Sequence, residues 1–187
     1  IDDPLIDGDQ TFEFITGDPA SLDLFYGVLN ADDVADINLV NQDNDFPFLN
    51  ISEPEILSED KNSTSISISL GNQPTGKVKI VFELTDVTEV SINKLGIEFD
   101  EFNWDIPQEL TLFGVDDPFL DGDIQSNLIL KIHSDTEDIN YLNMQSVSVE
   151  LITLDNEKDS DSDGAGDDFD NCPDISNPDQ NDFDGDG

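Results

Sequence analysis

The chain of 187 residues contains no arginine, and six lysines are its only strongly basic side chains. Nucleic acids are bound mainly through basic side chains that neutralise phosphate, so we predict no nucleic-acid partner. Direct insertion into or binding to an anionic membrane is disfavoured for the same reason. By contrast, 45 acidic residues give a net charge of −39. Such an excess keeps a protein soluble in salty water.

Histidine and cysteine are almost absent as well. The only histidine is His133 and the only cysteine is Cys172, which leaves no Ser-His-Asp, Cys-His or zinc constellation. Two carboxylates would suffice for a glycosidase, but no pattern here indicates a cleft. We therefore predict that the chain is not an enzyme. The single tryptophan, Trp104, is expected to pack on a sandwich edge, with an exposed sugar-stacking platform as the alternative.

Long apolar runs and helical apolar periods are also missing, so neither a transmembrane helix nor a helical domain is expected. Residues 64–70 and 77–84 instead alternate polar and apolar side chains with period two, as strands do. Turn residues separate them from further β-rich runs at 90–92, 95–99, 109–115, 128–132 and 147–154. The spacing predicts an all-β, immunoglobulin-like β-sandwich.

Two segments occur twice in the chain. Residues 1–9, IDDPLIDGD, recur as residues 115–123, VDDPFLDGD, at an offset of 114. Residues 35–44 align with residues 147–156 at an offset of 112. A repeat of about 110 residues is a typical β-sandwich length.

This repetition predicts three regions. Residues 1–45 are the C-terminal part of one sandwich repeat, with its last strands at 11–16 and 34–40. Residues 46–156 are a complete second sandwich, and residues 157–187 are a segment of another kind. Because the chain starts without Met and stops inside an acidic motif, we expect it to be a portion of a longer protein.

The final segment has the oxygen-ligand spacing of a calcium loop. Aspartates stand at loop positions 1, 3, 5, 9 and 12, a glycine at 6 and a backbone carbonyl at 7, and the register restarts near the end of the chain. A segment so acidic and so poor in apolar residues folds only if bound calcium supplies the free energy; otherwise it is a disordered acidic tail. The first loop comprises Asp159, Asp161, Asp163, Gly164, Ala165, Asp167 and Asp170, and the second begins with Asp182, Asp184 and Asp186.

Pro173 and Pro178 exclude the helix that follows an EF-hand or dockerin loop. The stretch from Asp159 onward, DxDxDGxGDxxDNCPxxxNPDQxDxDGDG, resembles the thrombospondin type 3 repeat. The resemblance implies calcium ligation by the first loop, with adjoining ions served by Asn177, Gln180, Asp182, Asp184 and Asp186. One departure is Phe169, which stands where the family usually has cysteine; any disulfide partner of Cys172 would then lie beyond residue 187.

The complete repeat shows a second resemblance. Its opening Ser-Glu pairs at 52–53 and 58–59, the segment 102–108 (FNWDIPQ) and the loop 116–123 are similar to Calx-beta-like modules of long bacterial surface proteins. The resemblance implies an immunoglobulin-like sandwich, in tandem arrays, with calcium at one end.

The repeated acidic loops allow two interpretations. They are either solvated hairpin loops or calcium sites at the sandwich pole and the domain junctions. The loop candidates are Asp2, Asp3, Asp7, Asp9, Asp116, Asp117, Asp121 and Asp123, and the junction candidates are Asp43, Asp45, Glu53, Glu59, Asp155 and Glu157.

Calcium sites of this number suit an extracellular compartment, where calcium is abundant. We expect a calcium-stabilised stalk or fibre body of a cell-surface or secreted adhesin-like protein, whose partners are neighbouring repeats. Two alternatives stay open. One is an adhesion module that binds a glycan or a protein receptor, and the other is a self-polymerising fibre subunit that exchanges β-strands with other copies.

Overall fold

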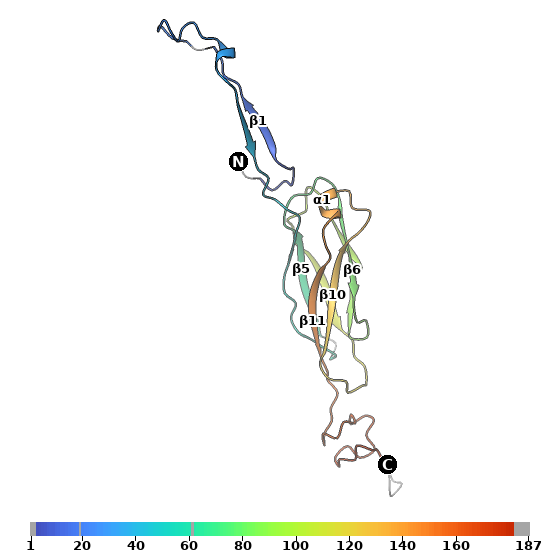
Figure 1. The fold of residues 1–187 in the computed structure, drawn as a ribbon. Helices are drawn as coiled ribbons and strands as arrows, with labels where there is room; N and C mark the ends of the chain where they lie inside the picture. The colour runs from blue at the N-terminus through green and yellow to red at the C-terminus, as the bar shows by residue number, and fades with distance from the viewer. Residues whose placement is uncertain (1–2, 19, 61, 182–187) are drawn as a thin grey trace. The chain divides into compact units, whose positions relative to one another are not determined.

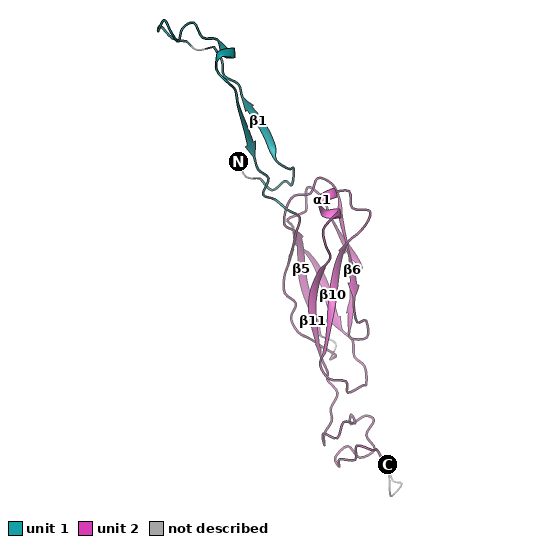
Figure 2. Cartoon of the chain, viewed as in Figure 1, with its two compact units in different colours: residues 1–46 teal, residues 47–187 magenta. Residues whose placement is uncertain are grey.

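A computed structural model describes residues 3–18, 20–60 and 62–181. The chain divides into two compact units, residues 1–46 (unit 1) and residues 47–187 (unit 2), as Figure 2 shows. Both units are built from strands. Among the described residues, no helix has the length and apolar character needed to cross a membrane.

Unit 2 contains two β-sheets (Figure 1). The first has the order β4 (Leu57–Ser58), β11 (Val147–Leu154), β10 (Ile124–Ile132), β6 (Val78–Leu84) and β8 (Gly96–Phe99). The second has the order β3 (Leu49–Ile51), β5 (Ser63–Leu70), β9 (Gln108–Gly114) and β7 (Val90–Ile92). Neighbouring strands are antiparallel except for β4 and β11, which run parallel.

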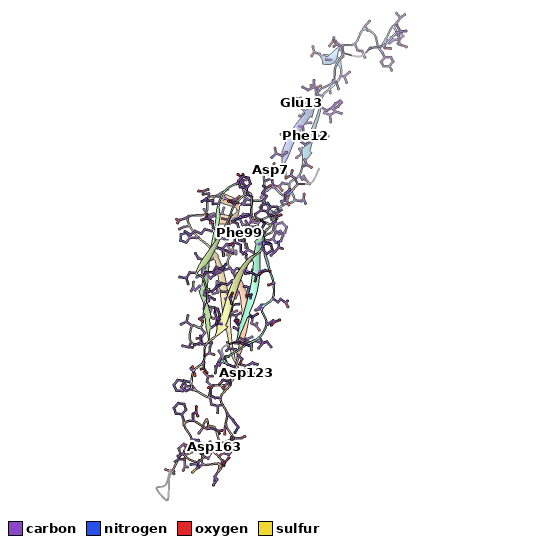
Figure 3. All side chains as sticks on the ribbon, turned by 180° about the vertical axis from the view of Figure 1, so that it is seen from behind. Asp7, Phe12, Glu13, Phe99, Asp123 and Asp163 are labelled. Carbon is purple, nitrogen blue, oxygen red and sulfur yellow. The ribbon has the colours of Figure 1, made fainter. Side chains whose placement is uncertain are left out.

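The two sheets enclose one apolar core. Every second side chain of the long strands is buried, as the period-two pattern predicts. The second sheet contributes Ile66 and Leu110, and the first contributes Ile80, Leu128 and Phe99, which is labelled in Figure 3. The predicted all-β, immunoglobulin-like sandwich is therefore confirmed.

Most strand boundaries lie within one or two residues of those expected from the sequence, although β10 begins four residues earlier. Sequence reasoning missed β3 and β4, because two or three residues are too few for an alternating pattern to stand out from the surrounding loops. The three residues of β7 were nevertheless predicted. Sequence reasoning also missed the short helix α1 (Ile139–Leu142). Asp138 caps this helix, and the Tyr141 side chain that follows is buried, with its hydroxyl donating to the Asn72 carbonyl at 2.7 Å.

Unit 1 consists of the antiparallel strands β1 (Gln10–Phe14) and β2 (Ile37–Asn41) and the residues around them, including a 3-10 helix, η1 (Ala31–Asp33). Its strand pairing has the register of β10 and β11. Gln10 faces Asn41 as Ile124 faces Thr153, which are the offsets of 114 and 112 found in the sequence. The two hairpins therefore share the register that the sequence offsets predict.

The hairpins differ in what covers them. Leu128 and Leu151 are buried in unit 2, whereas their counterparts Phe14 and Leu39 are 62% and 50% exposed in unit 1. The reason is that the described part of unit 1 has one two-stranded sheet and no second sheet to pack against.

Candidate metal centre

Three groups of carboxylates occur within the described residues, and in each group the candidate ligand atoms lie within 4.8 Å of one another. We name them the Glu59 group, the Glu89 group and the tail group. Figure 3 marks their surroundings, with Asp123 at the end of the sandwich and Asp163 in the segment that follows. The members are Glu59, Asp155 and Glu157; Glu89, Asp117 and Asp121; and Asp159, Asp161 and Asp163.

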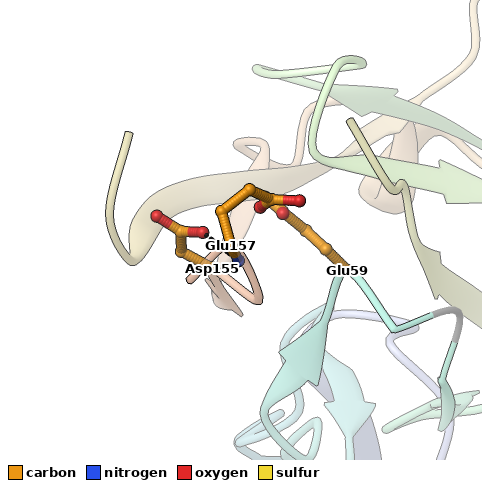
Figure 4. A group of neighbouring side chains, drawn as sticks. All are labelled: Glu59, Asp155 and Glu157. Atoms are coloured by element: carbon orange, nitrogen blue, oxygen red, sulfur yellow. Dashed lines mark hydrogen bonds between the residues drawn. The ribbon is translucent and has the colours of Figure 1, made fainter. Parts of the chain in front are cut away.

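The Glu59 group joins the ends of the two parallel strands (Figure 4). Glu59 directly follows β4, while Asp155 and Glu157 follow β11. The Glu59 N–H donates to the Leu154 carbonyl at 3.1 Å, which continues the ladder by one residue. A Cβ atom at Gly114 would lie 2.0 Å from the Ser58 carbonyl oxygen, so β9 can approach Glu59 only because residue 114 is glycine.

Burial makes it costly for the carboxyl groups of the Glu59 group to carry negative charge. Glu59 is 1% exposed, and Oε2 of both Glu59 and Glu157 is buried without a hydrogen-bond partner. Burial, reinforced by the neighbouring Glu157 carboxyl, raises the pKa of Glu59 to about 8. Burial and the proximity of Asp155 likewise raise the pKa of Glu157. Buried carboxylates without partners are costly unless they are protonated or bound to a cation.

Asp155 is in a different state. Burial opposes its ionisation, but backbone N–H groups of Glu157 and Gly122 outweigh this and lower the pKa of Asp155. The Gly122 N–H donates to Asp155 Oδ2 at 2.6 Å. Asp155 therefore offers a divalent cation an oxygen that is already anionic. Glu59 and Glu157 each offer a further oxygen, from carboxyl groups that would lose their protons when the cation binds.

The Glu89 group is assembled from more distant parts of the chain. Glu89 immediately precedes β7, and Asp117 and Asp121 lie in the loop between β9 and β10. Glu89 is 3% exposed, and its Oε2 atom also lacks a partner. Burial, followed by repulsion from Asp121, Asp86 and Asp117, raises the pKa of Glu89. The ion pairs that Lys77, Lys79, Lys131, His133 and Lys158 form within the described residues involve other carboxylates, none of them in this group or the Glu59 group.

Asp116 and Asp123, for which a calcium site and a solvated loop were the two interpretations, belong to neither of these groups. Asp123 Oδ1 accepts a 3.3 Å hydrogen bond from the Asp155 N–H, and Asp116 Oδ1 accepts one of 3.4 Å from the Asn156 side chain. Between them Gly122 adopts a φ of +79°, which favours glycine. Through these hydrogen bonds the two aspartates hold the acidic loop, residues 116–123, against the segment that follows β11.

The described part of unit 1 repeats the supporting contacts, and none of the three groups lies in it. The Gly8 N–H donates to Asp43 Oδ2 at 2.6 Å, the Asp43 N–H donates to Asp9 Oδ1 at 3.0 Å, and the Asp45 N–H donates to Asp43 Oδ1. Asp3 and Asp7 line the same hollow. Within the described part of unit 1 nothing corresponds to Glu59 or Glu89. Asp2 lies outside the described residues.

The tail group is organised by backbone hydrogen bonds to carboxylates. Asp159 accepts from the N–H groups of Ser162, at 2.7 Å, and Gly164, at 2.9 Å. Gly164 has a φ of +97°, as the sharp turn at loop position 6 requires. Asp161 Oδ2 is buried without a partner, and burial together with Asp163 and Asp170 raises the pKa of Asp161.

The remaining predicted tail ligands have other contacts. Asp167 binds Ser160 and, at 3.2 Å, the Lys158 ammonium. Asp170 is buried and accepts from the Cys172 N–H and the Gln180 amide. The Asn177 N–H donates to Asp163 Oδ2 at 2.6 Å, and the Ala165 N–H donates to Asp163 Oδ1. Asp182, Asp184 and Asp186 lie outside the described residues.

Sequence reasoning thus identified most members of the groups and missed one. Glu53, a candidate, is exposed and belongs to none of the three groups, whereas Glu59 of the same opening motif does. Glu89 was not foreseen, because it stands alone in the sequence and only the fold brings it to Asp117. Carboxylate oxygens are the ligands that calcium prefers, and a calcium ion takes about six to eight oxygens, so backbone carbonyls and water would complete each site.

The tail, residues 158–181, also contacts the sandwich. The Phe119 ring, from the acidic loop, stacks on the Phe169 ring with centroids 6.1 Å apart and an interplanar angle of 7°. Leu120 of the same loop lies against Gly166. Phe169, the departure from the type 3 pattern, is therefore part of a contact between the tail and the loop that carries Asp117 and Asp121.

No family model and no curated protein matches the chain. Among solved structures, SSP-19, an MSP-domain-like protein of Caenorhabditis elegans, is 9% identical over 53% of this chain and 92% of that one, with a TM-score of 0.38. The Escherichia coli chaperone DraB is 11% identical over 58% of this chain and 56% of that one, with a TM-score of 0.41. Domains 4 and 5 of the S-layer protein SbsC are 11% identical over 63% and 59%, with a TM-score of 0.32. No identification follows from similarities at this level.

Proposed function

We propose that the chain is a calcium-stabilised structural segment of a cell-surface or secreted protein, which spaces and presents other parts of that protein. The observation that carries the proposal is the pair of buried glutamates, Glu59 and Glu89, whose unpartnered oxygens each lie in a group of three carboxylates. A chain with 45 acidic residues and six lysines has few cations of its own to neutralise such groups.

The proposed calcium binding indicates the compartment in which the segment works. Extracellular modules bind calcium weakly and rely on its high concentration outside the cell, and several calcium sites in one chain suit that compartment, so we place the proposed segment there. We propose no catalytic role, because the chain has one histidine, one cysteine and no arginine, and the buried carboxylates lie at the end of a filled sandwich.

We further propose that unit 1 is the C-terminal part of a repeat of the unit 2 type. The identical register of the two hairpins and the matching hydrogen bonds of Gly8 and Gly122 support this. We therefore propose that the segment consists of repeats in tandem, each of which contacts the neighbouring repeats of the same protein.

Calcium titration tests the proposal. Isothermal calorimetry on the whole chain is expected to give binding heats with calcium and much weaker ones with magnesium, which demands smaller octahedral sites. Calcium at about 100 times its Kd is expected to raise the unfolding free energy by about 2.7 kcal/mol per site, read as a shift in Tm. Equal Tm values in calcium and in chelator would refute the proposal.

A further inference from the structure

The Glu59 group lies where the two ends of unit 2 meet. Traced from its beginning, unit 2 runs through β3 and β4 and reaches Glu59; traced back from the tail, it runs through Glu157 and Asp155 into β11. Residues 60–154, which form most of both sheets, lie between these two points. A bond between Glu59 and Asp155 or Glu157 therefore closes a loop around the body of the sandwich.

The strands that meet there are parallel, and this decides how they respond to force. Leu57 pairs with Thr153 and Ser58 with Leu154, both strands pointing the same way. When the two ends of unit 2 are pulled apart, β4 and β11 are drawn in opposite directions along their length. Their hydrogen bonds are then loaded together in shear, rather than one after another.

The protein's own bonds at this point are few. The ladder comprises two residue pairs and one further hydrogen bond, from the Glu59 N–H to the Leu154 carbonyl. The next side chains along both strands are the carboxylates of the Glu59 group, which Figure 4 shows converging from opposite sides. Glu59 is 1% exposed, and its Oε2 atom is buried without a hydrogen-bond partner.

We propose that the Glu59 group is a mechanical clamp, in which a bound calcium ion joins the end of β4 to the end of β11 and carries tension past residues 60–154. This deepens the function proposed above and rests on calcium binding there. With the ion in place, force passes from Glu59 through the metal to Asp155 and Glu157. Once β3 has separated from β5, the core strands between these residues carry little load.

The Glu89 group supplies a matched control. It also consists of three carboxylates with one buried glutamate, Glu89, which is 3% exposed, but all its members lie between residues 60 and 154. A metal there stabilises the sandwich without joining its two loaded ends. The two groups therefore share their chemistry and differ in whether they lie on the path of the force.

Force spectroscopy of the whole chain, held at its two ends, tests the clamp. At constant force with saturating calcium, we expect the sandwich to unfold more slowly than in chelator by about tenfold or more. Each unfolding event should release the length of residues 60–154, on the order of 300 Å. Glu59→Gln is expected to remove most of the calcium dependence of the unfolding rate, leaving only the stabilisation from the Glu89 group, and Glu89→Gln is expected to retain most of it.

Calorimetry of the same variants separates the clamp from the proposed function. If the unmodified chain binds no calcium, the proposed function fails and the clamp with it. If calcium binds but Glu59→Gln and Glu89→Gln change the rate under force by the same factor, calcium acts only by general stabilisation and the clamp is wrong. A calcium-independent rate for a chain that binds calcium at the Glu59 group also overturns it.

Discussion

Residues 47–157 and residues 158–181 belong to one compact unit, but their interiors are made of different groups. The sandwich buries aliphatic and aromatic side chains such as Ile66, Leu110 and Phe99. In the tail the apolar side chains of Phe169 and Ile175 are exposed, and the inward-facing atoms are carboxylate oxygens and backbone N–H groups. The first region is held by removal of apolar surface from water, the second by charge and hydrogen bonds.

The two regions should therefore respond to different perturbations. Apolar burial needs no ligand, whereas a loop of carboxylates repels itself until a cation is bound. Between the two regions lies the end of the sandwich, here called the pole, where Glu59 and Glu89 are buried carboxylates within the sandwich. Each experiment below tests how sharply this division holds.

The largest effect is expected from Phe99→Ala. Phe99 is fully buried, and truncating such a ring costs about 3–5 kcal/mol of unfolding free energy, through lost burial and the cavity left behind. The loss should be the same in calcium and in chelator. Denaturant unfolding followed by the fluorescence of Trp104, the only tryptophan, measures it. Phe102→Ala, at a ring that is 80% exposed, is the matched control and should change little.

Phe99→Ala is expected to destabilise the sandwich, whereas removal of calcium by a chelator is expected to act mainly on the tail. Without calcium, the amides of residues 158–181 should exchange at nearly unprotected rates, while those of β5, β6, β9 and β10 stay protected by the apolar core. Hydrogen exchange read by mass spectrometry resolves the two regions. Tail amides that keep their protection in chelator would show that the carboxylate–backbone hydrogen bonds suffice on their own, and the division would collapse.

The pole allows a pH experiment in chelator. The pKa of Glu59 is raised from the ordinary 4.5 to about 8 in the folded chain. The folded state therefore holds a proton that the unfolded state has released, so this contribution to stability is complete below about pH 4.5 and lost as the pH rises to about 8. We expect the calcium-free sandwich to be less stable at about pH 8 than at about pH 5.

Two comparisons isolate Glu59 as the source of that slope. Glu59→Gln, which cannot ionise, should flatten the decline in calcium-free protein. Saturating calcium should remove it in the unmodified chain, since the cation takes the place of the proton. A calcium-free chain that is as stable at the higher pH as at the lower one would contradict the burial assigned to Glu59.

Sequence alone predicted the sandwich well, for a physical reason. Strands such as β5 and β6 alternate polar and apolar residues along most of their length, so their burial is encoded locally. The strands β3 and β4 are too short for such a pattern to mark them in the sequence, and they are strands because the sheets provide partners. The offsets of 114 and 112 went further, since they reproduce the register of the unit 1 hairpin, with β1 and β2 displaced by one to three residues from the ranges expected.

The candidate sites divide in the same way. Asp159, Asp161 and Asp163 are neighbours in sequence, so their spacing alone predicts a common site. Glu89 and Asp117 are far apart in sequence, and only the positions of β7 and β9 bring them together. Asp167 has the correct spacing but binds Lys158 and Ser160. Spacing therefore indicates which residues can be ligands, while packing decides which of them converge.

The smallest effect concerns the contact between the two regions. Phe119 and Phe169 are stacked but more than half exposed, so the pair should contribute only about 0.5–1.5 kcal/mol. Phe169→Ala is expected to weaken calcium binding by the tail by about tenfold at most, since 1.4 kcal/mol corresponds to a factor of ten. Calorimetry measures this, and Ile175→Ala, exposed and elsewhere in the tail, is the control. The Tm of the sandwich should not change. If it falls, the tail and the sandwich fold as one cooperative structure, and the two kinds of interior are coupled through Phe169 instead of being independent.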